Sequence, residues 1–244
     1  MNTPLLRISG LRKSYGAVVV ADAIDFDITE GEAVGIIGPN GAGKSTLFNL
    51  IAGEVAPSGG KIFFAGRDIT TLPQPSRTHL GVARSYQIPR PFSDMTVYEN
   101  VLVGAMFGSG GRVSDPAVHC AQTLAACGLL DKADRLAGSL TLLERKRLEL
   151  ARAMACKPRL LMLDEIAGGL TEPEALELVG TIRTIHAEGT TILWIEHVLH
   201  ALVSVVSRLV VLSFGKKLGD GDPHSVLNSP EVREAYLGIE EAEA

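Results

Sequence analysis

The sequence lacks any long hydrophobic run. The most apolar late segment, residues 202–214, is interrupted by Arg208 and is too short to span a bilayer. The opening MNTPLLRISG has no basic region followed by an apolar stretch, so we expect no signal peptide. If this protein serves a membrane, we expect it to do so from the cytoplasmic side and through a partner.

The sequence also lacks an excess of positive charge and a metal-binding cysteine pattern. The formal net charge is −5, which disfavours sequence-independent binding to nucleic-acid phosphates. Three cysteines occur, Cys120, Cys127 and Cys156, without the CxxC spacing of zinc or redox sites. We therefore expect buried free thiols in a reducing compartment.

Runs of β-branched and other apolar residues indicate strands at residues 17–20, 24–28, 33–37, 61–64, 160–163, 190–195 and 209–212. Amphipathic segments that close near a glycine indicate helices at residues 44–52, 116–127 and 172–186. Strands that alternate with helices predict an α/β fold with a mainly parallel sheet. The strand-only beginning and end of the pattern predict an attached antiparallel sheet.

The strand pattern vanishes between about residues 89 and 157. We expect a single domain over residues 1–244. Its α/β core and antiparallel sheet would come from residues 1–88 and 158–244, and residues 89–157 would form an inserted helical subdomain.

The segment GPNGAGKS, residues 38–45, follows a buried strand and precedes a helix, as a phosphate-binding loop requires. Glycines let consecutive N–H groups point at phosphate oxygens, and the helix N-terminus adds positive potential. We expect Lys44 to reach the β- and γ-phosphates of a nucleotide and Ser45 to offer its hydroxyl to Mg²⁺. A chance glycine-rich turn would match these fixed positions in roughly one per cent of chains of this length.

Two acidic residues end another buried strand, residues 160–163. Because successive strand residues point to opposite faces, Asp164 and Glu165 can take different tasks. We expect Asp164 to hold Mg²⁺, and Glu165 to orient the attacking water or accept its proton. His197 ends a further strand, where open α/β sheets bind ligands, and would contact the γ-phosphate. His200 follows closely, but the pair lacks the carboxylates of a metal site.

The stretch SLTLLERKRLELARA, residues 139–153, reads as an amphipathic helix. Thr141 and Glu144 form a capping-box pattern, which predicts that this helix begins at Thr141. Locally, a plain surface helix explains the stretch. The neighbouring nucleotide motifs favour a role in an active site instead.

The order of these parts resembles the ATP-binding subunit of an ABC transporter. The matching elements are Tyr15 as the adenine-stacking aromatic, Gln87 in ARSYQIPRPF as the Q-loop, Asp164 and Glu165 as Walker B, His197 as the H-loop, and a Walker A loop made of Gly38, Pro39, Asn40, Gly41, Ala42, Gly43, Lys44, Ser45 and Thr46. The segments QIPRPFSDMTVYENVLVGA and EVREAYLGIEEA are similar to the branched-chain amino acid importer subfamily. The resemblance implies a P-loop NTPase fold with a RecA-like core.

The resemblance further implies two such subunits packed head to tail around two ATP molecules with Mg²⁺. Each ATP would contact the Walker A loop of one chain and the signature helix of the other. Lys44, Gln87, Glu165 and His197 would be catalytic. Ser45, Gln87 and Asp164 would hold Mg²⁺, and Thr141 would contact the nucleotide of the partner chain in trans.

The signature motif of this family usually reads LSGGQ, whereas here Leu140, Thr141, Leu142, Leu143 and Glu144 occupy the five positions. Leu142 and Leu143 replace glycines where phosphate needs close approach, and Glu144 adds a negative charge. We therefore predict functional asymmetry, with a heterodimer favoured over a homodimer. Two further departures from the family pattern are Ile166 for proline and Thr171 for the D-loop aspartate, and they concern communication between subunits.

The function that the resemblance implies is ATP hydrolysis that powers an ABC importer, from the cytoplasmic face of the inner membrane as a peripheral subunit. Permease subunits would dock near Gln87 and residues 89–95, and an extracytoplasmic binding protein would act indirectly. The cargo would be branched-chain amino acids or other small polar solutes such as urea, amides or aromatic acids. One alternative is an ABC-type ATPase acting on nucleic acid, which the acidic single unit disfavours. The other is a non-catalytic regulatory subunit, which Glu165 and His197 disfavour.

Overall fold

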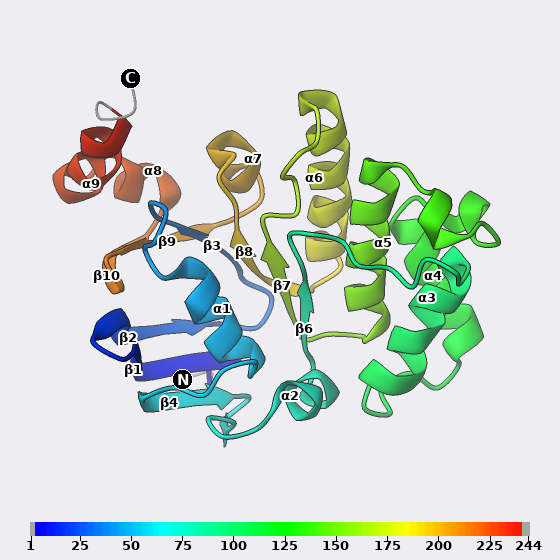
Figure 1. The fold of residues 1–244 in the computed structure, drawn as a ribbon, viewed down its shortest axis with the longest axis horizontal. Helices are drawn as coiled ribbons and strands as arrows, with labels where there is room; N and C mark the ends of the chain where they lie inside the picture. Colours follow the sequence, from blue (N-terminus) through cyan, green and yellow to red (C-terminus); the bar gives the residue numbers. More distant parts are fainter. Residues whose placement is uncertain (1–2, 241–244) are drawn as a thin grey trace. The chain divides into compact units, whose positions relative to one another are not determined.

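The computed structural model describes residues 3–240, and the chain divides into two compact units (Figure 1). Unit 1 comprises Met1–Pro73 and Leu193–Ala244, and unit 2 comprises Gln74–Ile192. Within residues 3–240 no helix is both long and apolar enough to cross a membrane. The helical subdomain expected at residues 89–157 lies within unit 2, and its boundaries stay a prediction.

Unit 1 contains an antiparallel four-stranded sheet with the order β2-β1-β4-β5. Its strands are β1 (Leu6–Tyr15), β2 (Val18–Ile28), β4 (Gly59–Phe64) and β5 (Arg67–Asp68), drawn in blue to cyan in Figure 1. The prediction of separate strands at residues 17–20 and 24–28 is wrong, because both belong to β2. Ala23 has a left-handed backbone, with φ +52°, and the pairing of β2 with β1 shifts in register, but the strand continues through this residue.

A second group of strands in unit 1 positions the expected phosphate loop. The fully buried β3 (Ala33–Ile37) runs parallel to β9 (Arg208–Ser213), and β9 pairs antiparallel with β10 (Lys216–Gly221). Helix α1 (Lys44–Ala52) follows β3, and the helices of the C-terminal part are α7 (Leu199–Val203), α8 (Pro223–Leu227) and α9 (Pro230–Glu240). The expectation of a strand-only end is therefore wrong, because helices lie there, although β9 and β10 do pair antiparallel. Strand β8 (Thr191–Ile195) runs across the chain boundary between the units.

Unit 2 pairs β6 (Val82–Ser85) in parallel with β7 (Leu160–Asp164). Its longer helical segments are α2 (Gln74–Leu80), α3 (Val97–Val103), α4 (Pro116–Ala126), α5 (Leu142–Ala155) and α6 (Glu172–Ala187). The short segments η1 (Gly104–Gly108), η2 (Leu130–Lys132) and η3 (Ala137–Ser139) connect them. Between β6 and β7, a stretch that the structure describes throughout, no strand occurs, which confirms the helical character expected there.

Helix α5 packs against α3, α4, α6 and β6. Two of the three cysteines, Cys120 and Cys127, are buried and Cys156 is partly buried, all as free thiols. Burial raises the pKa of Cys127 to about 12, so this thiol stays protonated and packs as an apolar group.

Candidate functional site

The expected phosphate loop lies between the buried β3 and α1, in unit 1. Gly43 precedes α1 with φ +98°, and a Cβ at this position would clash with the carbonyl oxygen of Val20. The left-handed conformation and the close backbone approach both require glycine here. The structure shows no side-chain hydrogen bond that caps this end of α1. The helix N-terminus therefore keeps the geometry of an anion site.

Lys44 is almost completely buried, with 6% of its surface exposed. Its Nζ donates to the carbonyl oxygens of Gly38, at 2.5 Å, and Pro39, at 3.1 Å. The ammonium group is thus held over the loop that would bind phosphate. Ser45, at the same helix end, is exposed, and its hydroxyl is an oxygen donor of the kind that Mg²⁺ prefers.

The turn between β9 and β10, which lies far from the loop in the sequence, supports the loop. The N–H of Gly215, in the turn between β9 and β10, donates to the carbonyl oxygen of Ala42 at 3.1 Å. The carbonyl oxygen of Gly215 accepts from the N–H of Asp22, in β2, at 2.8 Å. The β9–β10 turn therefore links the phosphate loop to the antiparallel sheet.

Unit 1 also carries the expected adenine-stacking residue and the expected H-loop residue. Tyr15 ends β1 and is 51% exposed, and the Nζ of Lys13 lies 4.8 Å from the centroid of its ring. This cation–π contact uses one face of the ring. His197 is exposed two residues after β8, and its N–H donates to Oε1 of Glu196 at 3.0 Å.

In unit 2, Asp164 is the last residue of β7 and is 7% exposed. Its Oδ2 lies 2.6 Å from Nη2 of Arg84, on the neighbouring strand β6. The guanidinium also lies 5.0 Å from the ring centroid of Tyr86. Arg84 thus balances the charge of a carboxylate that is buried at the strand end.

Glu165 follows directly, outside the strand, with φ +45°. The expectation that strand alternation separates the two carboxylates is therefore wrong, because β7 ends at Asp164. A non-glycine residue in the left-handed region is uncommon and occurs often at functional sites. The two acids do contact different partners, because Oε2 of Glu165 accepts from Nε2 of Gln87 at 2.6 Å.

Thr141 caps α5, which confirms the predicted helix start. The N–H of Thr141 donates to Oε2 of Glu144 at 2.8 Å, and the N–H of Glu144 donates to Oγ1 of Thr141 at 3.4 Å. The Nζ of Lys132 lies 3.2 Å from Oε1 of Glu144. Burial opposes ionisation of Glu144, but the Thr141 N–H and the Lys132 ammonium outweigh it and lower the pKa of this carboxyl. Leu142, the first residue of the helix, is 45% exposed.

The structure thus brings together Gln87 and Glu165 in unit 2, and Lys44, Ser45 and the glycine loop in unit 1. Among the residues that the structure describes, no group of three or more His, Cys, Asp or Glu side chains could hold a metal ion.

Sequence reasoning missed two features of this site. One is Arg84, for which the only local signal is a basic residue within a short apolar run. The other is the support of the loop by Gly215, where the adjacent Phe214 and Gly215 mark a turn between two strands.

Comparison with known proteins gives concordant results. The family model described as "ABC transporter" matches residues 21–168, and one described as "Branched-chain amino acid ATP-binding cassette transporter" matches residues 216–242. The chain is 37% identical to the high-affinity branched-chain amino acid transport ATP-binding protein LivG of Salmonella typhimurium, over 98% of this chain and 99% of the relative. It is 36% identical to BraF of Pseudomonas aeruginosa, which carries the same description, with the same coverage. Among solved structures, the ADP conformation of an ATP-binding cassette of an ABC transporter has a TM-score of 0.87 at 29% identity, covering 97% of this chain and 100% of the other.

Proposed function

The chain belongs to the ABC transporter ATP-binding family, and on this premise we propose that it hydrolyses Mg²⁺-ATP to power an importer of small solutes. The glycine loop that leads from β3 into α1, with the buried Lys44 above it, carries this proposal. In the proposed complex, Lys44 shifts its donor bonds from Gly38 and Pro39 to the β- and γ-phosphates, and the first N–H groups of α1 bind the same phosphates. Tyr15 stacks on the adenine.

Glu165 is proposed to accept the proton of the attacking water or to fix its orientation. Gln87, which donates to this carboxylate at 2.6 Å, orients it. His197 contacts the γ-phosphate and the attacking water. These roles concern positioning and charge, which dominate catalysis of phosphoryl transfer.

The residues present fit a magnesium ion that arrives with the nucleotide. Ser45, Gln87 and Asp164 supply hydroxyl, amide and carboxylate oxygens, the ligand types that Mg²⁺ prefers, and few protein ligands suffice when phosphates and water complete the shell. When bound, Mg²⁺ neutralises the charge that develops on the phosphates. Asp164 is already paired with Arg84, so it would act mainly through the water shell of the ion.

The proposed partner is a second ATP-binding subunit with an intact signature. Leu142 and Leu143 stand where that motif has glycine, and Leu142 projects exposed bulk at the start of α5. Glu144 is turned back onto Thr141 and Lys132, so its charge is largely balanced. The bulk of Leu142 and Leu143, rather than the charge of Glu144, then weakens the ATP site of the partner chain that this signature would complete in trans. In a heterodimer only one of the two ATP sites has this defect.

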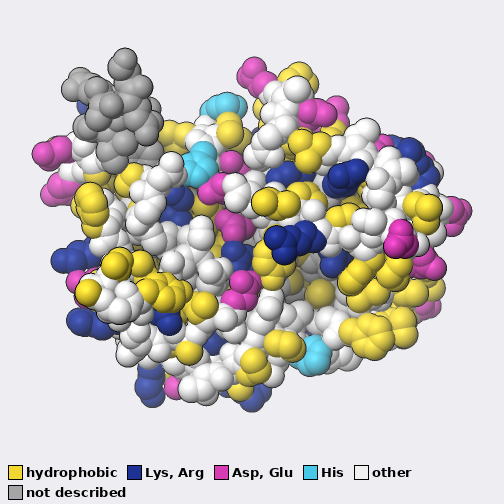
Figure 2. All heavy atoms as spheres, viewed as in Figure 1, with side chains coloured by type: hydrophobic (Ala, Val, Ile, Leu, Met, Phe, Trp, Pro, Cys, Tyr) yellow, Lys and Arg dark blue, Asp and Glu magenta, His cyan; other side chains and the backbone are white. Residues whose placement is uncertain are grey.

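We place the subunit on the cytoplasmic face of the membrane, as a peripheral partner of permease subunits that receive solute from an extracytoplasmic binding protein. The names of LivG and BraF support branched-chain amino acids as the cargo. A nucleic-acid substrate is not favoured: over the helices of unit 2, Figure 2 shows Lys and Arg side chains interspersed with Asp and Glu rather than gathered into a basic field.

The test requires a partner that supplies the missing glycines. We define the signature donor as a copy of this chain with Leu142→Gly, Leu143→Gly, Glu144→Gln and Glu165→Gln. The first three changes restore the usual signature residues, glutamine keeps the capping box, and the fourth disables the copy's own site. The wild-type chain mixed with this donor should hydrolyse ATP, and chelation of Mg²⁺ or Lys44→Ala in the chain should abolish the activity. ATP binding without turnover in the mixture would favour the non-catalytic regulatory role instead.

A further inference from the structure

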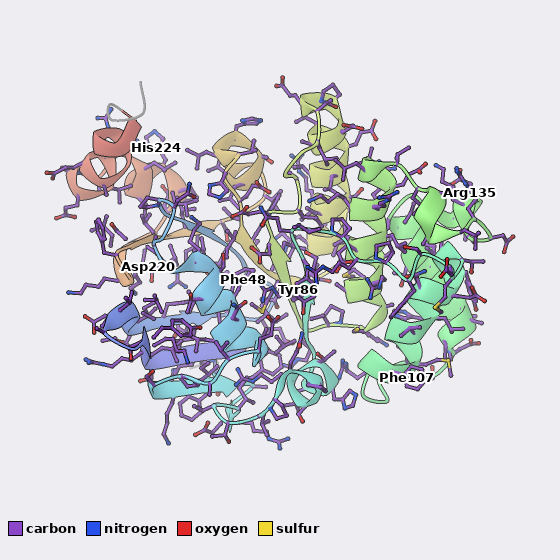
Figure 3. The ribbon with its side chains drawn as sticks, viewed as in Figure 1. Phe48, Tyr86, Phe107, Arg135, Asp220 and His224 are labelled. Atoms are coloured by element: carbon purple, nitrogen blue, oxygen red, sulfur yellow. The ribbon has the colours of Figure 1, made fainter. Side chains whose placement is uncertain are left out.

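One face of α5 holds the main chain of the segment that carries Gln87. This segment, residues 86–90, follows β6, and Figure 3 labels Tyr86 at its start. The residues Lys146, Glu149 and Arg152 recur at intervals of three along α5, so they share one side of the helix.

Two of the three side chains donate hydrogen bonds to main-chain carbonyl groups of the segment, and the third pairs with one of them. The Nζ of Lys146 donates to the carbonyl oxygen of Gln87 at 2.6 Å, and Nη1 of Arg152 donates to that of Arg90 at 2.9 Å. Burial raises the pKa of the Glu149 carboxyl, and Arg152 together with the main-chain groups of Tyr86 and Arg90 opposes this shift. Arg152 and Glu149 also form an ion pair at 3.0 Å. A single helix face thus bonds the segment at Gln87, near its start, and at Arg90, its last residue.

This arrangement is costly, which argues that its geometry matters. Lys146 is 2% exposed and Glu149 is 5% exposed, and charges at such burial must be hydrogen-bonded to be tolerated. Both charges are directed at backbone groups of one short segment. An apolar helix face could pack there, but it would not fix the position of individual main-chain atoms.

The segment in turn positions the proposed catalytic carboxylate. The carbonyl oxygen of Gln87 is bound by Lys146, while its side-chain Nε2 donates to Oε2 of Glu165 at 2.6 Å. We propose that Lys146, assisted by Glu149 and Arg152, is a positioning residue that fixes Gln87 so that the Gln87 amide holds Glu165 ready for the attacking water. The inference rests on the proposed function, because it assigns Glu165 its role in hydrolysis. It ties α5, the helix that carries the degenerate signature, to the proposed catalytic carboxylate of the same chain.

The test compares Lys146→Met, Lys146→Arg and the control Arg145→Met in mixtures with the signature donor. Methionine keeps the apolar stem but loses the donor, and arginine keeps a cationic donor. Arg145 is the neighbouring cation on α5; it is exposed and bonds the main-chain carbonyl of Gly138, outside residues 86–90, at 3.1 Å. The readouts are kcat and KM for Mg²⁺-ATP, and hydrogen exchange of the segment amides, which are those of residues 86, 87, 88 and 90.

We expect Lys146→Met to lower kcat about tenfold with KM changed less than about twofold, because a charge-assisted hydrogen bond is lost without loss of a nucleotide contact. Exchange at residues 86–90 should rise about tenfold, and that of the remaining α5 amides should not. Lys146→Arg should recover most of the activity, and Arg145→Met should match the wild type. In a Gln87→Leu background, Lys146→Met should cause no further loss, since both act on Glu165 through Gln87.

If the losses of kcat in Gln87→Leu and Lys146→Met multiply in the double variant, the inference is overturned. An unchanged kcat in Lys146→Met, or raised hydrogen exchange along the whole of α5, would also overturn it. If the wild-type mixture itself shows no hydrolysis, the proposed function fails. The exchange measurement then still decides whether Lys146 fixes the segment.

Discussion

The side-chain amide of Gln87 donates from Nε2 to Oε2 of Glu165 across 2.6 Å. The two residues are far apart in the sequence, and the left-handed backbone of Glu165, with φ +45°, accompanies this contact. A carboxylate held by an amide keeps its charge and its direction. The contact therefore fixes the direction of the Glu165 carboxylate, as its proposed role in orienting a water requires.

Replacing Gln87 by leucine should lower ATP turnover in the donor mixture about tenfold, since Glu165 loses a hydrogen-bond donor that orients it. Nucleotide affinity should change less than about twofold, because Lys44 and the loop N–H groups bind the phosphates and Gln87 supplies only one of the proposed Mg²⁺ ligands. The matched control is Gln122→Leu, which removes an exposed amide from α4 of unit 2. A loss of affinity as large as the loss of turnover would show that Gln87 acts in binding instead.

Lys44→Ala should abolish stabilisation by nucleotide. A ligand at one hundred times its Kd stabilises the folded state by about 2.7 kcal/mol, and Mg²⁺-ATP should raise the melting temperature of the wild type but not that of this variant. Lys61→Ala provides the control, since it removes an exposed cation of unit 1 that pairs with Asp68 at 3.4 Å. An equal thermal shift in Lys44→Ala and the wild type would place the phosphate site elsewhere.

Gly43→Ala should destabilise the fold more than Gly41→Ala does. Both glycines have positive φ, +98° and +79°, and alanine costs about 1–2 kcal/mol in that region. At Gly43 the added Cβ would also clash with the Val20 carbonyl, whereas at Gly41 it meets nothing within 4 Å. Denaturant unfolding should show an additional loss of about 1–3 kcal/mol for Gly43→Ala. Equal losses would mean that the loop relaxes freely away from β2.

Asp220 should make the stability of unit 1 depend on acid pH. Burial opposes its ionisation, but hydrogen bonds from Arg208, at 2.6 Å, and Lys217, at 2.9 Å, lower its pKa below the ordinary value of 3.8. A lowered pKa in the folded state contributes stability above the unfolded value, and this contribution is lost as the pH falls through the folded value. Asp220→Asn should therefore reduce the free energy of unfolding at pH 7 by about 1–3 kcal/mol.

The same variant should show a smaller decline of stability than the wild type between about pH 4 and pH 2. Denaturant unfolding across this range measures the difference. Parallel declines of the two proteins would contradict the assignment to Asp220.

Local signals in the sequence predicted much of the secondary structure. The phosphate loop and α1 were predictable because glycines, a buried strand and a helical pattern occur together within a short stretch. The start of α5 followed from the capping pattern of Thr141 and Glu144. The same pattern, Thr96 with Glu99, caps α3 in the structure and was available in the sequence, but the β-branched residues of that helix obscured it.

Other elements depend on contacts between distant residues. The polar, glycine-containing β10 is a strand because it pairs with β9, and β6 is a strand because it pairs with β7. The ion pair of Arg84 with Asp164, and the bond of Lys146 to Gln87, join residues 80 and 59 positions apart. No local pattern indicates such partners. The sequence motifs therefore predict the proposed reacting groups, whereas the residues that hold them in place become evident only in the folded structure.

The central claim is that this chain's own Walker site is competent and that its signature is not. The most direct measurement is the specific rate of Mg²⁺-ATP hydrolysis by the chain alone over a range of protein concentrations, beside its mixture with the signature donor, with Glu165→Gln as the blank. The account predicts a negligible rate for the chain alone at every concentration, and turnover in the mixture that vanishes with Glu165→Gln. A specific rate of the chain alone that climbs with concentration to the level of the mixture would contradict it.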